Sequence, residues 1–383
     1  MSVKNSVVVV GGGIMGVQAA WHLANLGQNV TLLDQFDVPN QWAASGDHLR
    51  VFRMTYGKDA FYSEMALKSM PMWLELNTLS EDTLLQQNGV LEMAAKEDGY
   101  EAHSMAVLKD LKIKCERLDA AAIRRLYPMY NPKAFKWALF HPDGGMIWAN
   151  RAVSAMASIA QRKGVRFRSG VKVVSLVKEK GQLRGVKDAA GKVWEAEKFL
   201  FACGHWTHEL LKDQGIPTKV TKQEQLFLRP LFNRGRYRPE HFPVFSEHAS
   251  GFYGFPVHIH GFIKIGAHRK GPVVKKVDLD DLRTLSPKFE KSCRAFLKKF
   301  MPELAPFTEF EGHVGWYDNT PDNDFLVDRL PSMANVYLAA GFSGHGFKFA
   351  PIIGKSIAEL MVAGKSELNL HRFRATRFKL RKS

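Results

Sequence analysis

The first thirty-four residues alternate between short apolar runs and turns. Residues 7–10 are consecutive valines, an uninterrupted β-branched run that is typical of a strand buried on both faces of a parallel sheet. Residues 17–26 carry apolar side chains at helical spacing and predict a helix that stops at Gly27, and residues 29–33 predict a second strand. The order strand, helix, strand predicts a βαβ unit at the start of the chain.

The rest of the chain shows two further patterns. Apolar runs that end in glycine, at residues 198–204 and 335–341, predict two more strands of the parallel type. Residues 225–275 alternate aromatic and polar residues with many glycines, which predicts antiparallel sheet. The remaining expectations are strands around a turn at residues 165–174, a hairpin from residues 182–186 and 192–194, and helices over residues 278–300 and 352–361.

A glycine-rich turn joins the first predicted strand to the first predicted helix. Gly11, Gly13 and Gly16 fit the pattern G-x-G-x-x-G, and Asp34 ends the next strand. In this context the motif predicts a dinucleotide site: Gly11 permits the tight turn, Gly13 lets a pyrophosphate approach the backbone, and Gly16 lets helix and strand pack closely. The helix N-terminus offers free N–H groups to the phosphates. Asp34 can accept hydrogen bonds from ribose hydroxyls, and its charge disfavours the 2′-phosphate of NADP.

These patterns together predict an α/β (α+β) chain. A Rossmann-type nucleotide-binding domain is assembled from both ends and the middle of the sequence, and an antiparallel-sheet substrate domain is inserted into it. We expect the first domain to contain residues 1–85, 145–220 and 315–383, and the second to contain residues 86–144 and 221–314.

Composition places the chain among ordinary globular proteins. Apolar residues make up 45% and charged residues 24% of its 383 residues, which excludes disordered and fibrous classes and suits two or three domains. The cysteines Cys115, Cys203 and Cys293 form no CxxC pair, so they indicate neither a disulfide framework nor a cysteine-rich zinc site. No apolar run approaches the roughly 18 residues of a membrane span, and the N-terminal valines are too few for a signal peptide. We expect a cytoplasmic protein.

The formal net charge is +16 at pH 7, which raises the possibility of nucleic acid, an anionic membrane or an anionic ligand as partner. The one dense basic patch is the tail at residues 372–382, which we expect to be a solvated terminus. Elsewhere the basic residues do not cluster with interleaved aromatics, which argues against a specific nucleic-acid partner.

Four motifs follow the glycine-rich turn in order. They are Ser45-Gly46-Asp47 with Arg50 and Arg53; Tyr253-Gly254-Phe255-Pro256 leading to Lys264 and His268; Tyr317 with Thr320-Pro321-Asp322; and GFSGHGFK at residues 341–348. With these motifs the sequence resembles, over nearly its full length, the monomeric sarcosine oxidase and N-methyltryptophan oxidase family within the D-amino-acid-oxidase-like flavoproteins.

The resemblance implies that the Rossmann-type domain binds FAD and that the protein oxidises a secondary amine or amino acid carrying a carboxylate. A hydride passes to the flavin to give an imine, and O₂ reoxidises the flavin to give hydrogen peroxide. A cavity rich in Arg and Lys favours the neutral amine that this chemistry needs. Family members differ in oligomeric state, so a monomer or a small homo-oligomer is expected.

The resemblance also implies catalytic roles. Lys264 matches the lysine beside the flavin N5 edge that activates oxygen, where a fixed cation stabilises the developing superoxide. Arg53 and Lys348 match the pair that grips the substrate carboxylate. Arg50 matches the arginine that lies against the flavin ring and makes it a better hydride acceptor.

Further residues are implied to line the cavity or to hold the cofactor. His268 and Tyr317 match cavity residues, and Tyr253 belongs to the same set. The cofactor-binding residues implied are Gly11, Gly13, Ile14, Met15, Gly16, Asp34, Ser45, Arg50, Val173, Gly204, Trp206, Gly341, Gly344, His345, Gly346, Phe347 and Lys348.

Three positions depart from the family pattern. Several members hold FAD covalently through a cysteine two residues before the tyrosine matched by Tyr317; here that residue is Gly315, so we expect FAD to be bound non-covalently. His48 lies between Asp47 and Arg50, where sarcosine oxidases have one residue fewer, and it is given no family role. Trp316 is similar to a tryptophan of the fructosyl-amino-acid oxidase branch, which indicates a larger or different substrate.

Alternatives remain at this stage. A dehydrogenase that passes electrons to a quinone or carrier shares the same chemistry, and so does an oxidase of glycated (fructosyl) amino acids. A nucleic-acid-modifying flavoprotein is a third reading, motivated by the charge. No metal site is expected, because His258 and His260 form only an i, i+2 pair on a predicted strand.

Overall fold

The computed structural model describes residues 4–229, 234–275, 277, 279–280 and 283–378. Within them a six-stranded sheet has the order β19 (Leu326–Arg329), β20 (Val336–Ala340), β13 (Lys198–Phe201), β1 (Ser6–Val10), β2 (Asn29–Leu33) and β9 (Arg166–Arg168). All neighbours are parallel except β19, which pairs antiparallel with β20. The predicted strands at residues 7–10, 29–33, 198–204 and 335–341 are therefore confirmed, and they belong to one sheet.

The valines of β1 are buried because different layers cover the two faces of the sheet. Val7 and Val9 belong to the apolar cluster that contains helices α1 (Ile14–Asn25), α5 (Ala149–Arg162) and α8 (Ala350–Ala363). Val8 and Val10 belong to a second cluster, with residues of the small antiparallel sheet β10 (Val173–Glu179), β11 (Gln182–Asp188) and β12 (Val193–Glu195). Side chains alternate across a strand, so an uninterrupted apolar run is what two covered faces require.

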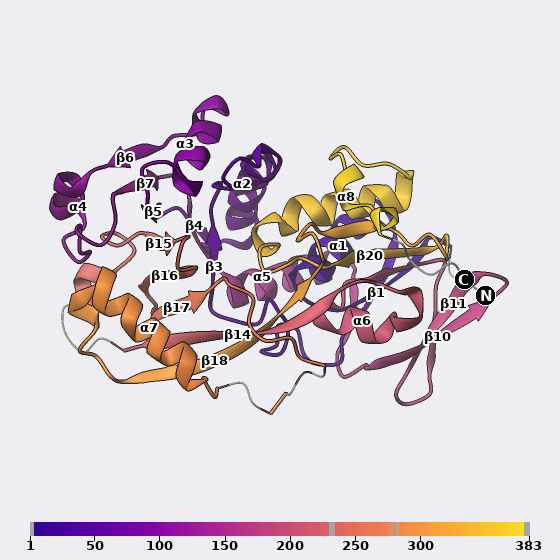
Figure 1. The fold of residues 1–383 in the computed structure, drawn as a ribbon. Helices are drawn as coiled ribbons and strands as arrows, with labels where there is room; N and C mark the ends of the chain where they lie inside the picture. Colours follow the sequence, from indigo (N-terminus) through magenta and orange to yellow (C-terminus); the bar gives the residue numbers. More distant parts are fainter. Residues whose placement is uncertain (1–3, 230–233, 276, 278, 281–282, 379–383) are drawn as a thin grey trace.

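A second large sheet holds eight strands in the described residues. Its order is β18 (Phe310–Asn319), β14 (Lys219–Leu228), β17 (Ile263–Ala267), β16 (Phe252–Val257), β15 (Val244–Glu247), β5 (Val90–Ala94), β7 (Trp137–His141) and β6 (Glu116–Leu118). Every pair is antiparallel except β15 with β5, which confirms the antiparallel sheet expected for residues 225–275. Helix α7 (Pro287–Phe300) packs on this sheet through Cys293, Phe296 and Leu297 (Figure 1).

The predicted helix over residues 278–300 is wrong at its start. Helix α7 begins at Pro287, and the hydroxyl of Ser286 accepts the N–H of Phe289 at 3.2 Å as its N-cap. Proline disfavours helical backbone in the residue before it and suits the first helical position, so residues 283–286 are outside the helix. Residues 278 and 281–282 lie outside the described residues.

Several elements were not predicted. They include helices α2 (Ala60–Ser80), α3 (Tyr100–Asp110), α4 (Ala120–Leu126) and α6 (Thr207–Leu210), and a small sheet of β3 (Leu49–Phe52), β8 (Gly145–Trp148) and β4 (Leu85–Gln86). Strands β14 and β18 are neighbours in the eight-stranded sheet and pair along their whole length, from Lys219 with Asn319 to Leu228 with Phe310. Two of the predicted domain boundaries, after residues 220 and 314, fall inside these strands. The division into two domains stays a prediction.

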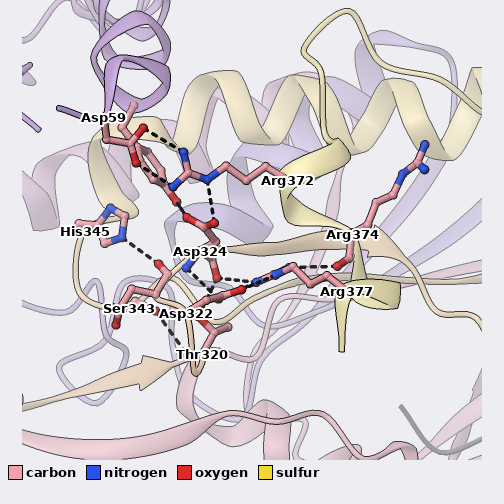
Figure 2. A network of polar contacts seen from close by, with 11 residues as sticks. Asp59, Thr320, Asp322, Asp324, Ser343, His345, Arg372, Arg374 and Arg377 are labelled. Atoms are coloured by element: carbon pink, nitrogen blue, oxygen red, sulfur yellow. Dashed lines mark hydrogen bonds and ion pairs between the residues drawn. The ribbon is translucent and has the colours of Figure 1, made fainter. Parts of the chain in front are cut away.

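The C-terminal segment does not match the solvated terminus that its composition predicts. Arg372 forms ion pairs with Asp59 and Asp324, and Arg377 forms one with Asp322 (Figure 2). The prediction is therefore wrong for these two arginines, because the fold places them against acidic side chains that are distant in sequence. Residues 379–383 lie outside the described residues. None of the helices in the described ranges combines the length and apolar character needed to cross a membrane.

Candidate active site

A cavity of about 1100 Å³ takes its walls from both large sheets. Most of the residues that the sequence predicts for the site line it, although they come from widely separated stretches of the chain. These are Gly11, Gly13, Ile14, Met15, Asp34, Ser45, Arg50, Arg53, Val173, Gly204, Trp206, Tyr253, His268, Tyr317, Gly344, His345, Gly346, Phe347 and Lys348. The other three predicted residues, Gly16, Lys264 and Gly341, are buried behind the wall.

At one end of the cavity, the glycine-rich turn lets the start of helix α1 form part of the wall. Gly11 has φ +107°, and a Cβ there would lie 2.4 Å from the carbonyl oxygen of Ala202 on the neighbouring strand end. A Cβ on Gly16 would lie 1.9 Å from the carbonyl oxygen of Gly11, so the helix and the turn touch only because both residues are glycine. The first turn of α1 therefore points its N–H groups toward the cavity, where that of Ile14 donates to the Ser45 hydroxyl at 3.4 Å.

Asp34 stands at the end of β2 and shapes the same turn. One carboxylate oxygen accepts the N–H of Gly12 at 2.6 Å, and the other accepts the N–H of Phe36 at 2.8 Å. Burial raises the pKa of Asp34, and these two hydrogen bonds oppose the shift. A free helix N-terminus, a close glycine turn and a strand-end acid on one cavity wall are the features a dinucleotide needs, so the residues present fit such a group.

On the opposite side, three charged side chains meet behind and at the cavity wall. Lys264 on β17 forms an ion pair with Asp47 and donates to the carbonyl oxygen of Leu49 at 2.9 Å. Arg50 on β3 donates to the same Asp47 carboxylate at 2.6 Å. Burial lowers the pKa of Lys264 to about 8, and Asp47 opposes that shift. Burial alone would raise the pKa of Asp47, but the two cations hold it below its usual range.

A second pair of cations meets on the ring of Tyr56. The guanidinium carbon of Arg53 lies 4.8 Å from the ring centroid, and the ammonium of Lys348 lies 5.2 Å from it and donates to the Tyr56 hydroxyl at 2.7 Å. Arg53 also donates to the Tyr100 hydroxyl at 2.6 Å. Burial first, and then the charge of Arg53, hold the pKa of Lys348 well below its usual range. Two basic side chains converge on one wall of the cavity, as a site for an anionic group requires.

Aromatic and small residues form the wall between the two cationic groups. The hydroxyl of Tyr317 lies 3.4 Å from Nδ1 of His268. Gly344 has φ +79°, and a Cβ there would lie 2.2 Å from the Tyr317 ring, so the loop approaches this ring as only glycine allows. Desolvation at the cavity wall and the charges of Arg53 and Lys348 lower the pKa of His268. Tyr253, a neighbour of Tyr317, has its pKa raised by burial.

Four residues of the site were missed in the sequence. Asp47 lies inside the motif Ser45-Gly46-Asp47. A buried lysine and arginine need a counter-charge, and this carboxylate was the signal in the sequence that could have supplied it. Tyr56 and Tyr100 gave no signal, because they meet Arg53 only through the fold. Glu92, also missed, is buried beside the cavity, where it accepts the hydroxyl of Thr55 at 2.6 Å and burial raises its pKa.

The structure adds His48 to the pair of His258 and His260. Their ring nitrogens lie within 4.8 Å of one another, the one group of this kind among the described residues that has the geometry to hold a metal ion. Nδ1 of His258 already accepts the N–H of His260 at 3.1 Å, which puts the proton of the neutral ring on Nε2. Burial first lowers the pKa of His48, the charge of Asp47 opposes that shift, and the charges of Lys264 and Arg50 add to it. The proton on Nε2 of His258 opposes a cation there, and the expectation of no metal stays a prediction.

Comparison with known proteins identifies the family. The sequence model of the FAD dependent oxidoreductase family (DAO) matches residues 6–360. The chain belongs to this family. It is 29% identical over 392 residues to the monomeric sarcosine oxidase of Bacillus sp. (strain B-0618), covering 100% of this chain and 98% of that protein. It is 27% identical to the N-methyl-L-tryptophan oxidase of Escherichia coli O81 (strain ED1a), covering 98% of this chain and 100% of the other.

Solved structures agree on the fold. The L-proline dehydrogenase from P. horikoshii superposes with a TM-score of 0.87 at 21% identity, covering 99% of both chains. A fructosyl peptide oxidase superposes with a TM-score of 0.84 at 23% identity, covering 97% of this chain and 93% of the other. The predicted fold class and family are therefore confirmed. The chain is an FAD-dependent oxidoreductase, which is the predicted class of enzyme. The roles of single site residues stay predictions.

Proposed function

We propose that this FAD-dependent oxidoreductase is an oxidase of a secondary amine or amino acid, of the sarcosine and N-methyl amino acid class. The observation that carries the proposal is the convergence of Arg53 and Lys348 on Tyr56, at the cavity wall. An arginine fork matches a planar carboxylate, and the ammonium adds a second cation. The sarcosine and N-methyl-L-tryptophan oxidases related to this chain over their full length support the same substrate class.

The cationic wall also sets the protonation state of the substrate. Arg53 and Lys348 disfavour a protonated amine near them, because like charges repel in an enclosed cavity. The lowered pKa of His268 keeps its ring neutral, so His268 adds no further positive charge to this wall. The residues of this wall thus bind the carboxylate and leave the nitrogen lone pair free.

FAD would be held by the glycine-rich turn, the α1 N-terminus and Asp34 at one end, and would meet Arg50 at the other. The chemistry that FAD supplies when bound is acceptance of a hydride from the C–H bond beside the amine nitrogen and transfer of two electrons to O₂. Lys264 would supply the buried positive charge that favours reduction of O₂. With glycine rather than cysteine at position 315, the cofactor is held without a covalent bond.

The visible spectrum of the purified holoenzyme tests this function. Anaerobic addition of sarcosine, N-methyltryptophan and other N-methyl or cyclic amino acids should bleach the oxidised flavin with at least one of them. Admission of air should restore the colour and release one hydrogen peroxide per turnover. A flavin colour that returns only after a quinone is added would make the protein a dehydrogenase. Bleaching by glycated amino acids alone would move the substrate class to fructosyl compounds.

A further inference from the structure

The C-terminal segment is tied to the loop at residues 320–324. Arg377 pairs with the carboxylate of Asp322 at 2.8 Å and donates to the carbonyl oxygen of Asp324, also at 2.8 Å (Figure 2). Arg372 donates through Nε to the carboxylate of Asp324 at 2.7 Å. Both arginines therefore hold a loop that lies more than forty residues earlier in the chain.

Arg372 also reaches the start of helix α2. Its two terminal nitrogens donate to the two carboxylate oxygens of Asp59 at 2.9 and 2.7 Å, a bidentate pair. Asp59 is the N-cap residue of α2, yet within the described residues its side chain caps no N–H of that helix. Its own N–H donates to the carbonyl oxygen of Tyr56 at 3.0 Å, so the turn that presents Tyr56 is fixed where Arg372 grips it.

A second set of contacts connects Arg372 to Tyr56 through Asp324. The hydroxyl of Tyr62 donates to the Asp324 carboxylate at 2.9 Å, and its ring stacks on that of Tyr56 with centroids 5.0 Å apart at 22°. The guanidinium of Arg372 lies over the Tyr62 ring at 4.9 Å. Tyr56 is thus positioned from its backbone and from its ring by groups that all contact Arg372.

The hydrogen bonds around Tyr56 form a chain in which each group donates to the next. Nε2 of His345 lies 3.1 Å from the carbonyl oxygen of Asn323 and must donate to it, which leaves Nδ1 as the acceptor (Figure 2). Nδ1 then accepts from the Tyr56 hydroxyl at 3.4 Å, and that hydroxyl accepts from the Lys348 ammonium. Asn323, with φ +65°, sits in the loop that Arg372 and Arg377 hold, so this loop supplies the last acceptor of the chain.

We propose that Arg372 is a positioning residue for the carboxylate-binding cations: it clamps the start of α2 to the loop at residues 320–324 and so aligns Tyr56 beneath Arg53 and Lys348. This inference rests on the proposed function, because it takes these two cations as the substrate's carboxylate site. It assigns the basic C-terminal segment a role in substrate affinity, although Arg372 itself is not in the cavity wall.

Calorimetric titration of the FAD-loaded enzyme with acetate, propionate and benzoate tests the proposal. The variants are Arg372→Gln, Arg372→Lys and Tyr62→Phe, which keeps the ring and removes the hydroxyl that reaches Asp324. The control is Arg236→Gln, whose partner Glu303 lies at 2.9 Å and whose side chain is 38% exposed against 34% for Arg372. Melting temperatures and flavin content are recorded for every variant.

We expect Arg372→Gln to weaken carboxylate binding about tenfold or more, because small misplacements of a positioning group are costly. Tyr62→Phe should weaken it less, Arg372→Lys should restore part of the affinity, and Arg236→Gln should stay within about twofold of the wild type. With the substrate, KM should rise far more than kcat falls. If Arg372→Gln lowers the melting temperature but binds carboxylates as the wild type does, the arginine is merely structural and the proposal is overturned.

Different results would overturn the carboxylate site and the positioning role of Arg372. A wild-type protein that binds none of the three carboxylates would overturn the carboxylate site itself and, with it, the role of Arg372. A wild type that binds them together with unaffected Arg372 variants would overturn the positioning role alone. Should Arg372→Gln fail to fold, Arg372→Lys and Tyr62→Phe decide: unchanged affinity in both would overturn the proposal.

Discussion

Lys264 and Asp47 form an ion pair in which each side chain is only 1% exposed. Lys264 comes from β17 in the eight-stranded sheet, and Asp47 lies two residues before the short strand β3. Arg50 donates to the same Asp47 oxygen that Lys264 contacts, so one carboxylate holds two cations at the edge of the cavity. A buried pair with these extra hydrogen bonds fixes a positive charge in place, and its disruption leaves a buried charge uncompensated.

Replacement of Lys264 by methionine should separate the two halves of the reaction. We expect anaerobic reduction by substrate to persist, whereas reoxidation by O₂ slows by about 100- to 1000-fold, because the charge that favours O₂ reduction is lost. Stopped-flow measurement of both half-reactions checks this. Reoxidation at the wild-type rate would refute the assigned role of Lys264.

The same substitution should lower the free energy of unfolding by about 3–5 kcal/mol, since within the described residues Asp47 then keeps Arg50 as its one ion-pair partner. The exposed Lys355, which pairs with Glu367 at 2.6 Å, serves as the control, and Lys355→Gln should cost less than about 1 kcal/mol. Urea denaturation of both variants provides the comparison.

Reoxidation should also depend on pH. Burial lowers the pKa of Lys264 to about 8, so its charge is complete below that pH and is lost as the pH rises through it. We expect the second-order rate constant with O₂ to fall above about pH 8 in the wild type and to lose this step in Lys264→Met. A step that survives the substitution would belong to another group.

Carboxylate binding should take up a proton at Lys348. Burial and the charge of Arg53 hold the pKa of Lys348 well below its usual range in the free site, and a bound carboxylate raises it again. Affinity should therefore be highest at low pH and weaken as the pH rises through the pKa of the free site. Calorimetry of acetate binding in buffers of different ionisation enthalpy measures the uptake, which Lys348→Met should abolish.

Gly315 offers room for the missing attachment residue. A Cβ at this position would meet only the side-chain nitrogen of Gln225, at 3.8 Å, which is ordinary van der Waals contact. We expect the wild type to release all its FAD on acid precipitation and Gly315→Cys to retain a fluorescent flavin band on a denaturing gel. Gly315→Ser is the matched control, because it fills the same space without a thiol. A flavin that stays with the acid-precipitated wild type would contradict non-covalent binding.

Asp34→Asn should weaken the binding of FAD by about 10- to 100-fold, in line with the loss of a charged acceptor of hydrogen bonds. The amide keeps one oxygen for the N–H of Gly12 or Phe36 but turns a donor toward the other. Fluorescence titration of the apoprotein with FAD measures the change. Unchanged affinity for FAD would show that Asp34 does not contact the cofactor.

The sequence determined the parts of this protein that depend on local patterns. The valines of residues 7–10, the glycine spacing from Gly11 to Gly16 and the acid at Asp34 predicted the start of the parallel sheet and the shape of its dinucleotide turn. They could do so because strand burial, tight turns and helix packing are set by neighbours along the chain. The family motifs added Lys264, Arg53 and Lys348 through resemblance, and all three meet at or behind one cavity.

Only the tertiary structure decided which side chains these residues contact. Asp47 and Lys264 are 217 residues apart, and Asp59 and Arg372 are 313 apart, so no local pattern connects either pair. The composition of the tail predicted solvation, because charged residues near a terminus usually face water. The fold instead brought three carboxylates to Arg372 and Arg377, and charge-assisted hydrogen bonds hold the tail there. Long-range pairing of this kind follows from the packing of the sheets and helices, which the chain reaches only as a whole.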